Sequence, residues 1–175
     1  MDHYENVIAA ALLAVSDRVR SAAEQAAGRG GAGAAALTAI HGWANGQPIE
    51  ALATGLDLSH SRTVRIVDAL EGDGLVRRRP DPSDARRALV QLTASGRAAC
   101  QRILRARERA LHEALAPLDD HQRDALAEVA EALVANAVSS RGDARLICRF
   151  CDTRACGHDD DRCPATREAD RLENK

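Results

Sequence analysis

The chain has 175 residues, of which 45% are hydrophobic and only 2% aromatic, and it carries a net charge of −2. This length suits one compact core with appendages, and a core made almost wholly of Ala, Leu, Val and Ile favours closely packed helices. No stretch approaches the roughly 18 to 20 uninterrupted apolar residues of a membrane span, and no signal segment is recognisable. We therefore expect a mainly α-helical, cytoplasmic protein with no membrane partner.

Positive charge is concentrated in one part of the chain. Between Ser59 and Arg109 there are twelve arginines and six acidic residues, and the only lysine of the chain is Lys175. The planar guanidinium group suits bidentate contacts to phosphate and guanine, although genomic base composition could produce the same bias. The distribution of charge, more than its sum, is compatible with nucleic-acid binding.

The N-terminal third of the chain predicts two helices. Residues 3 to 26 place apolar side chains at three- and four-residue spacing, as an amphipathic helix requires. The glycine-rich run from Gly28 to Gly33 reads as a flexible connector, because it lacks the Gly-Lys-Ser/Thr ending of a phosphate-binding loop. A second helix is expected over residues 34 to 44, with Leu37, Ile40 and Trp43 on one face.

Two shorter helices and a hairpin follow. Residues 49 to 56 and 60 to 72 read as helices joined by a tight turn, and Ser59 is a good N-cap for the second of them. This is the pattern of a helix-turn-helix. Residues 75 to 79 and 88 to 93 read as strands connected by the turn-forming segment 80 to 84. Two strands alone are marginal, so the hairpin must pack on the helices before it.

Helical periodicity returns at Ala94 and continues to Gly142, which we expect to end the last long helix. Pro117 interrupts this region, and the second of its helices is expected to begin at Asp119 or Asp120, since acidic residues suit a helix N-terminus.

A dense set of motifs spans residues 49 to 93. In chain order they are Ile49-x-x-Leu52-Ala53-x-x-Leu56-x-Leu58-Ser59, Arg65-Ile66-Val67-Asp68-x-Leu70-Glu71-x-x-Gly74-Leu75-Val76, Asp81-Pro82-x-Asp84-x-Arg86 and Val90-x-Leu92-Thr93. In type and spacing this segment resembles the MarR family of bacterial regulators. The resemblance implies a mainly α fold with a small β-hairpin, namely a winged helix-turn-helix domain flanked by long dimerisation helices. It also implies a homodimer on a pseudo-palindromic site in double-stranded DNA.

Within this segment, the expected DNA contacts lie at the start of the fourth helix and on the wing. Thr63, Ile66, Val67 and Leu70 form an inward stripe, which leaves the polar side chains His60, Ser61, Arg62 and Arg65 for bases and phosphates. A merely solvated helix face is the alternative reading. The resemblance implies that Arg86 reaches into the minor groove and that Asp84 anchors it. Arg87, Arg77, Arg78 and Arg79 are either phosphate contacts or a solvated strand face.

Two positions depart from the family pattern. Asp57 stands where glycine is common, and because Asp tolerates the left-handed conformation better than most residues, we expect the turn to form. Val64 stands where a hydroxyl residue is common, and it could instead touch a thymine methyl group.

The C-terminal tail carries four cysteines, Cys148, Cys151, Cys156 and Cys163, with His158 as an alternative ligand. In a reducing compartment such a cluster favours metal ligands or redox-active thiols over structural disulfides. Zinc prefers four tetrahedral thiolate or imidazole ligands, and it could order a tail that has little to bury. The spacing favours zinc, with redox-sensing thiols and an iron–sulfur cluster as alternatives. Cys100, far away in a helix, reads as an ordinary small apolar residue.

Together these features divide the chain into an N-terminal dimerisation helix and connector (1–33), a winged helix-turn-helix domain (34–93), C-terminal dimerisation helices (94–142) and a cysteine-rich zinc knuckle (143–175). The function that they favour is a DNA-binding transcriptional regulator, in particular a dimeric repressor that responds to a small-molecule effector, metal or redox signal. A protein-interaction module on the same scaffold is the alternative. We find no nucleophile or general-base pattern, so we do not expect an enzyme.

Overall fold

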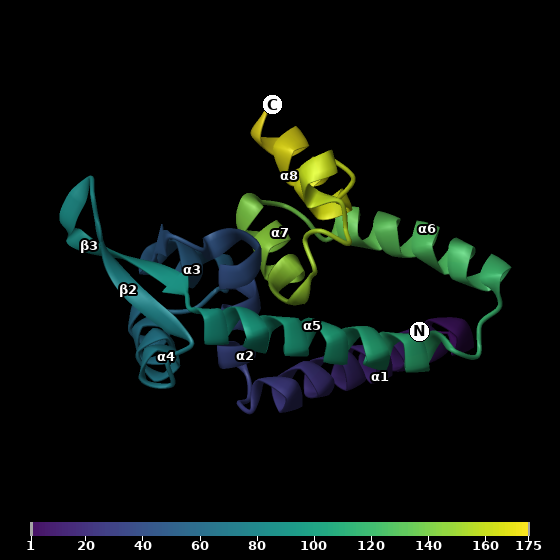
Figure 1. Ribbon diagram of the computed structural model, residues 1–175. Coiled ribbons are helices and arrows are strands. Elements are labelled where there is room, and N and C mark those ends of the chain that lie inside the picture. The colour runs from purple at the N-terminus through teal and green to yellow at the C-terminus, as the bar shows by residue number, and fades with distance from the viewer. Residues whose placement is uncertain (1, 175) are drawn as a thin grey trace.

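Two long antiparallel helices form one side of the molecule. The computed structural model describes residues 2–174, apart from the side chains of residues 85, 86 and 159. Helix α1 (His3–Ala27) begins at Asp2, whose carboxylate accepts a hydrogen bond from the N–H of Glu5, and it ends at Gly28, where φ is 65°. Figure 1 shows α1 running alongside α5 (Ala94–Leu115), with the winged domain at one end of the pair.

The helix-turn-helix lies between these long helices in sequence. Helix α2 (Ala32–Ala39) continues into a π-helical turn, η1 (Ile40–Ala44), and is followed by α3 (Ile49–Gly55) and α4 (His60–Gly72). The turn between α3 and α4 contains Asp57 in the left-handed conformation, with φ at 51°. Ser59 caps α4, because its hydroxyl accepts a hydrogen bond from the N–H of Arg62. The predicted helix-turn-helix is therefore present, and Asp57 adopts the backbone conformation that its position requires.

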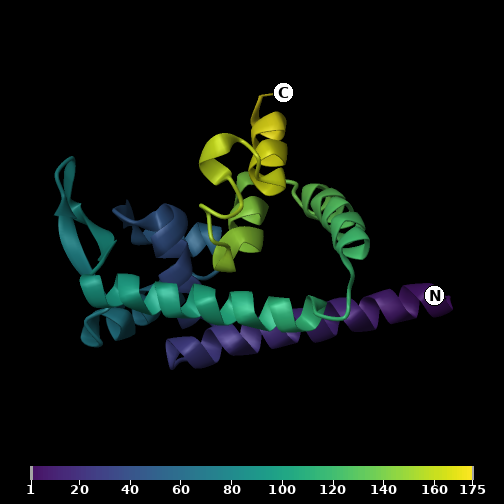
Figure 2. The same ribbon diagram turned by 45° about the vertical axis from the view of Figure 1, so that its right-hand side comes forward.

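The wing is an antiparallel hairpin of β2 (Val76–Asp81) and β3 (Asp84–Leu92), with Val76 opposite Leu92. A short strand, β1 (Gln47–Pro48), pairs with the other edge of β3, so the strand order is β1-β3-β2. Thr93 joins the base of the wing to α5, since its hydroxyl donates to the carbonyl of Gly74 (2.7 Å) and accepts from the N–H of Gly96 (3.0 Å). Figure 2 shows the hairpin projecting at the end opposite α6.

One hydrophobic core holds the winged domain to the long helices. Its fully buried aliphatic side chains come from η1 and from the helices and strands that pack around it. Removing such side chains from water is the main driving force for folding. Its largest members are Leu37, Ile40, Leu52, Val67, Leu70, Val76, Val90 and Ile103.

The C-terminal region packs around a second, smaller core. Helix α6 (Asp120–Asn136) starts at the N-cap Asp119 and leads to α7 (Arg141–Ile147), η2 (Cys148–Phe150), η3 (His158–Asp160) and α8 (Pro164–Glu173). Arg141 ties α7 to α8 through ion pairs with Asp170 and Glu173. The buried members of this core are Val138, Ala144, Cys163, Ala165 and Ala169. Most of these side chains are small, so the tail buries little apolar volume of its own.

The structure differs from the sequence-based expectations at several boundaries. Within the expected helix over 34 to 44, the α-helical part ends at Ala39 and residues 40–44 are π-helical. The strands extend further toward the wing tip than predicted, which leaves Pro82 and Ser83 between them. Strand β1 was not predicted. Gly142 does not end the last long helix, because α6 stops at Asn136 and Ser140 caps a new helix, α7, that contains Gly142.

Apolar side chains remain exposed on α1 and α6. They include Val7, Ile8, Leu12 and Leu13 on α1 and Leu126, Val129 and Leu133 on α6, each at least 41% exposed. In the part of the chain that the structure describes, no helix combines the length and apolar character needed to cross a membrane. The exposed apolar side chains thus lie on helices from both halves of the chain.

The close approach of α5 to the base of the wing requires glycine at position 96. A Cβ atom placed on Gly96 would lie 1.9 Å from the carbonyl oxygen of Leu75, whereas one placed on Gly72 meets nothing within 4 Å. We predict that Gly96→Ala lowers the free energy of unfolding by about 3 kcal/mol, because backbone must move to relieve the clash. Gly72→Ala, the matched control, changes it by less than about 1 kcal/mol. Urea denaturation followed by circular dichroism measures both, and equal stabilities for the two variants would contradict this packing.

Candidate functional site

The outer face of α4 presents the side chains that were expected to contact DNA. Thr63, Val67 and Leu70 are fully buried, with Ile66 partly so, and this fixes the rotation of the helix about its axis. The opposite face exposes His60, Ser61, Arg62 and Arg65. A helix anchored by one face, with polar side chains at its exposed N-terminal half, has the form of a recognition helix for the major groove.

His60 has a nearby acidic neighbour from the preceding helix. Its Nδ1 atom lies 3.9 Å from a carboxylate oxygen of Glu50, and both side chains are about 60% exposed. At this distance and exposure the pair does little to restrain the imidazole ring. The ring is therefore free to turn toward a ligand at the start of α4.

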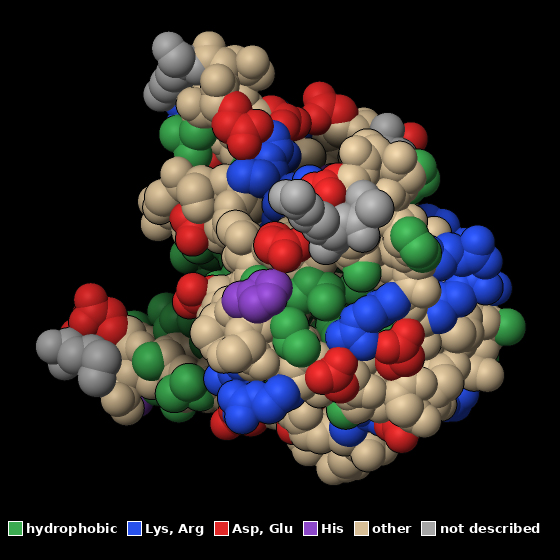
Figure 3. Space-filling model, turned by 90° about the vertical axis from the view of Figure 1, so that its left-hand side faces the viewer, with side chains coloured by type: hydrophobic (Ala, Val, Ile, Leu, Met, Phe, Trp, Pro, Cys, Tyr) green, Lys and Arg blue, Asp and Glu red, His purple; other side chains and the backbone are tan. Residues whose placement is uncertain are grey.

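The wing tip presents charged side chains near the same end of the molecule. Asp81 shapes the tip, because its carboxylate accepts hydrogen bonds from the N–H (2.8 Å) and the hydroxyl (2.7 Å) of Ser83. These bonds lower the pKa of Asp81 below its ordinary value. Asp84 and Arg87 are exposed, while the predicted minor-groove residue Arg86 has a side chain outside the described part of the structure. Figure 3 shows several arginine side chains at this end of the molecule, interspersed with acidic ones.

Arg78 has a different role from its strand neighbours. Its guanidinium group donates to Asp68 (2.7 Å) and pairs with Glu71, and its backbone N–H donates to Glu71 as well (2.8 Å). These bonds connect β2 of the wing to α4. Arg78 therefore positions the wing against the recognition helix, whereas Arg77 and Arg79 remain exposed.

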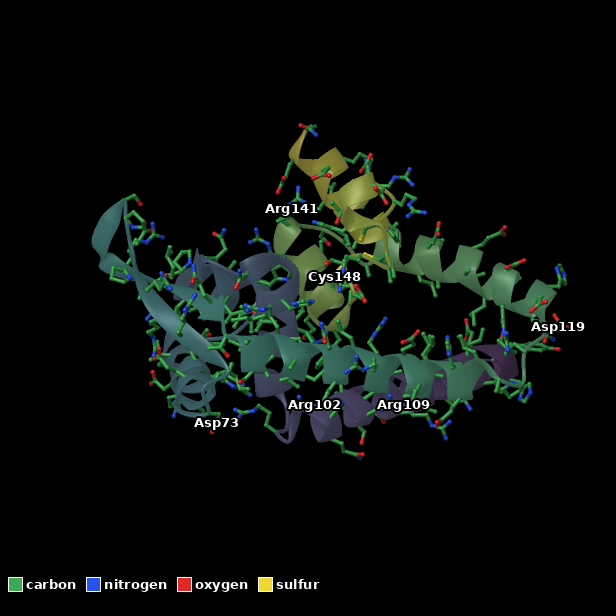
Figure 4. All side chains as sticks on the ribbon, in the orientation of Figure 1. Asp73, Arg102, Arg109, Asp119, Arg141 and Cys148 are labelled. Carbon is green, nitrogen blue, oxygen red and sulfur yellow. The ribbon has the colours of Figure 1, made fainter. Side chains whose placement is uncertain are left out.

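All four tail cysteines line one cavity in the C-terminal region. The cavity has a volume of about 230 Å³, and Trp43, Arg141, Arg145 and His158 also line it. Cys148 and Cys151 stand at the two ends of a tight turn, in which the N–H of Cys151 donates to the carbonyl of Cys148 (2.9 Å). Figure 4 shows Cys148 where α7 meets the C-terminal segment. The predicted cysteine cluster is thus brought together in space.

The four thiols are free and lie close to one another. Cys148 lies near Cys151 and Cys163, and Cys156 lies near Cys163. The neighbouring thiols raise the pKa of Cys148 and, together with the nearby guanidinium groups of Arg107 and Arg149, lower the pKa of Cys151 to about 6. The neighbouring groups therefore favour ionisation of Cys151 over that of Cys148.

Backbone and side-chain donors also surround individual sulfur atoms. Although burial opposes ionisation of Cys163, the N–H groups of Ala165 and Thr166 and the Thr166 hydroxyl donate to its sulfur and lower its pKa. Burial raises the pKa of Cys156 to about 11. Among the described residues, no group of three or more His, Cys, Asp and Glu side chains is already arranged to hold a metal ion. The four thiols share one cavity without such an arrangement.

The two other candidates from the sequence are placed differently. The imidazole Nδ1 of His158 lies 2.9 Å from the hydroxyl of Thr166, so this nitrogen is already engaged. Cys100 is fully buried in the main core, where its thiol donates to the carbonyl of Leu37 and burial raises its pKa to about 12. It is far from the tail cluster and chemically inert, as an apolar core residue would be.

Sequence reasoning did not assign Trp43, Arg141 and Arg145 to this cavity. Trp43 was expected only on the inner face of a core helix, and neither arginine had a role. The guanidinium carbon of Arg145 lies 5.0 Å from the centre of the Trp43 ring, which joins α7 to η1. Nothing in the local sequence pattern connects these residues, because their proximity depends on how the tail docks.

Comparisons with known proteins agree with this geometry. The family model described as the MarR family matches residues 35–88. Wild-type MarR from E. coli superimposes with a TM-score of 0.62 at 20% identity, covering 76% of this chain and 98% of that one. A probable transcriptional regulator from Pseudomonas aeruginosa gives a TM-score of 0.56 at 26% identity, with 75% and 99% covered. A mutant of S. aureus MepR bound to an oligodeoxyribonucleotide gives 0.58 at 15% identity, with 78% and 99% covered.

A search of curated protein sequences found no significant match. The expected fold class and the expected family are nevertheless both confirmed, since the family match falls on the helix-turn-helix and the wing, and the fold matches extend over the long helices. Residues 35–88 therefore match the MarR family in sequence, and the chain has the fold of the MarR-family transcriptional regulators.

Proposed function

We propose that this chain is a homodimeric, cytoplasmic repressor that binds a pseudo-palindromic operator in double-stranded DNA. The observation that carries the proposal is the exposed N-terminal half of α4, where Arg62 and Arg65 stand beside a charged wing at one end of the molecule. We call α4 together with the wing of one chain a reading head. A small-molecule effector, a metal ion or an oxidation event would release the operator by changing the distance between the two reading heads of the dimer. Bound near a promoter, such a dimer would exclude the transcription machinery.

We expect this dimer to make contacts of two kinds with DNA. Arg62 and Arg65 could grip guanine edges or phosphates in the major groove, and His60 and Ser61 lie beside them at the N-terminus of α4. Arg86 would reach the minor groove, with Asp84 and Arg87 beside it on the wing. Narrow A·T-rich grooves attract such an arginine, so this contact reads the shape of the DNA more than its sequence.

The exposed apolar faces of α1 and α6 support the homodimer. Leu12 is 55% exposed and Leu133 is 51% exposed in the single chain, and both belong to apolar stripes. Contiguous exposed apolar surface marks an interaction site. Two reading heads would then engage half-sites about one helical turn, roughly 34 Å, apart, which makes up for the small area that one head buries on DNA.

Arginine substitutions test the DNA contacts. We predict that Arg62→Ala and Arg86→Ala each weaken operator binding by about 1 to 3 kcal/mol, because each removes a charged contact to a groove or phosphate. Fluorescence anisotropy with an operator selected from random duplexes measures the effect. Arg171→Ala, on the exposed surface of α8 and paired with Glu168, is the matched control and should leave binding unchanged. Wild-type affinity in both test variants would refute the assignment.

A charge placed on the apolar stripe of α1 tests the dimer. We predict that Leu12→Glu shifts the protein toward monomer by at least about tenfold in dissociation constant, since it buries an unpaired carboxylate in the interface. Ser95→Glu introduces the same charge at an exposed position in the first turn of α5, away from both apolar stripes, and should leave the dimer intact. Sedimentation-equilibrium measurements decide between them, and equal dissociation constants for the two variants would contradict this interface.

We also propose zinc as the cofactor of the tail. Support comes from the four free thiols at one cavity, from the tight Cys148–Cys151 turn, and from the small core that the tail buries by itself. Thiolates in a tetrahedral zinc site lie about 2.3 Å from the metal, so neighbouring sulfur atoms are about 3.8 Å apart. All four thiols border the cavity in which such a site would form.

Metal analysis tests the cofactor. Protein purified without a chelator is predicted to hold one zinc ion per chain, and Cys163→Ser is predicted to lose most of it, because three thiolates alone bind less tightly. Cys100→Ala should keep its zinc, since Cys100 lies in the main core. Zinc far below one per chain, with all thiols of the unmodified protein freely titratable, would favour redox-active cysteines instead.

A further inference from the structure

Trp43 lies between the cysteine cavity and the helix-turn-helix. It lines the cavity together with the four tail cysteines, and Arg145 of α7 stacks over its ring. On the α3 side the indole packs against Gly55, where a Cβ atom would come within 2.2 Å of the ring. The absence of a side chain at Gly55 thus allows the indole to sit directly on the first helix of the helix-turn-helix.

The indole N–H of Trp43 has no hydrogen-bond partner. Its Nε1 atom is buried, and among the described side chains it is one of few such atoms without an acceptor. A buried unpaired donor costs about 1 to 3 kcal/mol. Sulfur atoms of zinc-bound thiolates carry negative charge and accept N–H hydrogen bonds, so thiolates in the cavity that Trp43 lines would be acceptors of the kind that the indole lacks.

The surroundings of the cavity are electropositive. Arg145 borders it, and Arg107 and Arg149 lie near the thiol of Cys151. Four thiolates around one Zn²⁺ carry a net charge of −2, which would be costly in a neutral buried setting. These arginines, which belong to α5, α7 and η2, would offset the negative charge of a four-cysteine zinc site. They would repel a cation that is not bound by thiolates.

The tail also contacts the winged domain at two further points. The hydroxyl of the buried residue Thr38 in α2 donates to the backbone carbonyl of Arg149 in η2. A Cβ atom on Gly42 of η1 would lie 3.1 Å from a methyl carbon of Thr153, so the loop after Cys151 approaches η1 closely. Helix α7 also packs on α3. The tail therefore contacts three elements of the winged domain, namely α2, η1 and α3.

We propose that zinc bound by Cys148, Cys151, Cys156 and Cys163 holds the tail against Trp43, η1 and α3, and thereby raises the affinity of the reading head for DNA. This inference rests on the proposed DNA-binding function and zinc cofactor. The tail core is small and rich in alanine, so the metal supplies much of the energy that keeps the tail docked. A docked tail restrains α3, on which the recognition helix packs, and a preorganised head loses less conformational entropy on binding.

A zinc titration of the full chain tests the inference. Reduced protein stripped with a chelator is titrated with Zn²⁺, and the fluorescence of Trp43, the single tryptophan of the chain, reports occupancy of the site. Operator affinity is then measured by anisotropy at full zinc occupancy and in excess chelator. We expect at least a tenfold higher affinity with zinc. Because binding equilibria are linked, operator DNA must tighten zinc binding by the same overall factor, shared between the two zinc ions of the dimer.

Thr38→Val separates docking of the tail from metal binding. It removes the hydrogen bond to Arg149 while leaving all four cysteines and every expected DNA contact unchanged. We expect this variant to bind one zinc ion and to lose most of the effect of zinc on operator affinity. Cys151→Ser should lose both zinc and its effect, and chelation of the wild-type protein gives the same comparison if that variant does not fold.

The outcomes distinguish this inference from the proposals beneath it. Equal operator affinity with and without zinc, at full occupancy, overturns the coupling and leaves DNA binding intact. Zinc that weakens operator binding overturns it as well. If the protein does not bind zinc, the proposed cofactor is wrong. If it binds no duplex DNA either with or without zinc, the proposed function itself is wrong.

Discussion

The burial of one face of α4 is the constraint on which the rest of the structure depends. Thr63, Val67 and Leu70 are completely enclosed by the core, so the helix cannot turn about its axis without exposing them. That alone directs Arg62 and Arg65 outward. Arg78 extends the same constraint to the wing, because its bonds to Asp68 and Glu71 hold β2 against α4. The helix and the wing therefore form one reading head rather than two independent contacts.

Small residues allow this head to be connected to distant parts of the chain. Gly96 lets α5 approach the carbonyl of Leu75, which joins the wing to a long helix that packs along α1. Gly55 lets the Trp43 ring lie on α3, with the cysteine cavity on its other side. The long helices and the tail are thus both joined to the reading head by closely packed contacts. Interfaces packed this closely favour discrete shifts over gradual deformation.

Local signals predicted much of this structure, and contacts between distant segments account for what they missed. Ser59 as an N-cap and the hydrophobic spacing in α4 are local features, so the helix-turn-helix and the expected DNA-contact residues could be placed from sequence. Strand β1 consists only of Gln47 and Pro48 and exists because it pairs with β3, which no two-residue pattern reveals. The cysteine spacing predicted a cluster, but the part played by Trp43 depends on docking of the tail.

The salt dependence of operator affinity tests the central claim most directly. A reading head that neutralises phosphates with arginine must release counterions, so the logarithm of affinity should fall linearly with the logarithm of salt concentration, by about 0.9 for each phosphate contacted. For a dimer that makes roughly six or more such contacts, this account predicts a loss of about a thousandfold between 50 and 200 mM salt. Absence of duplex binding at low salt, or an affinity that does not change with salt, would contradict it and favour a protein-interaction module.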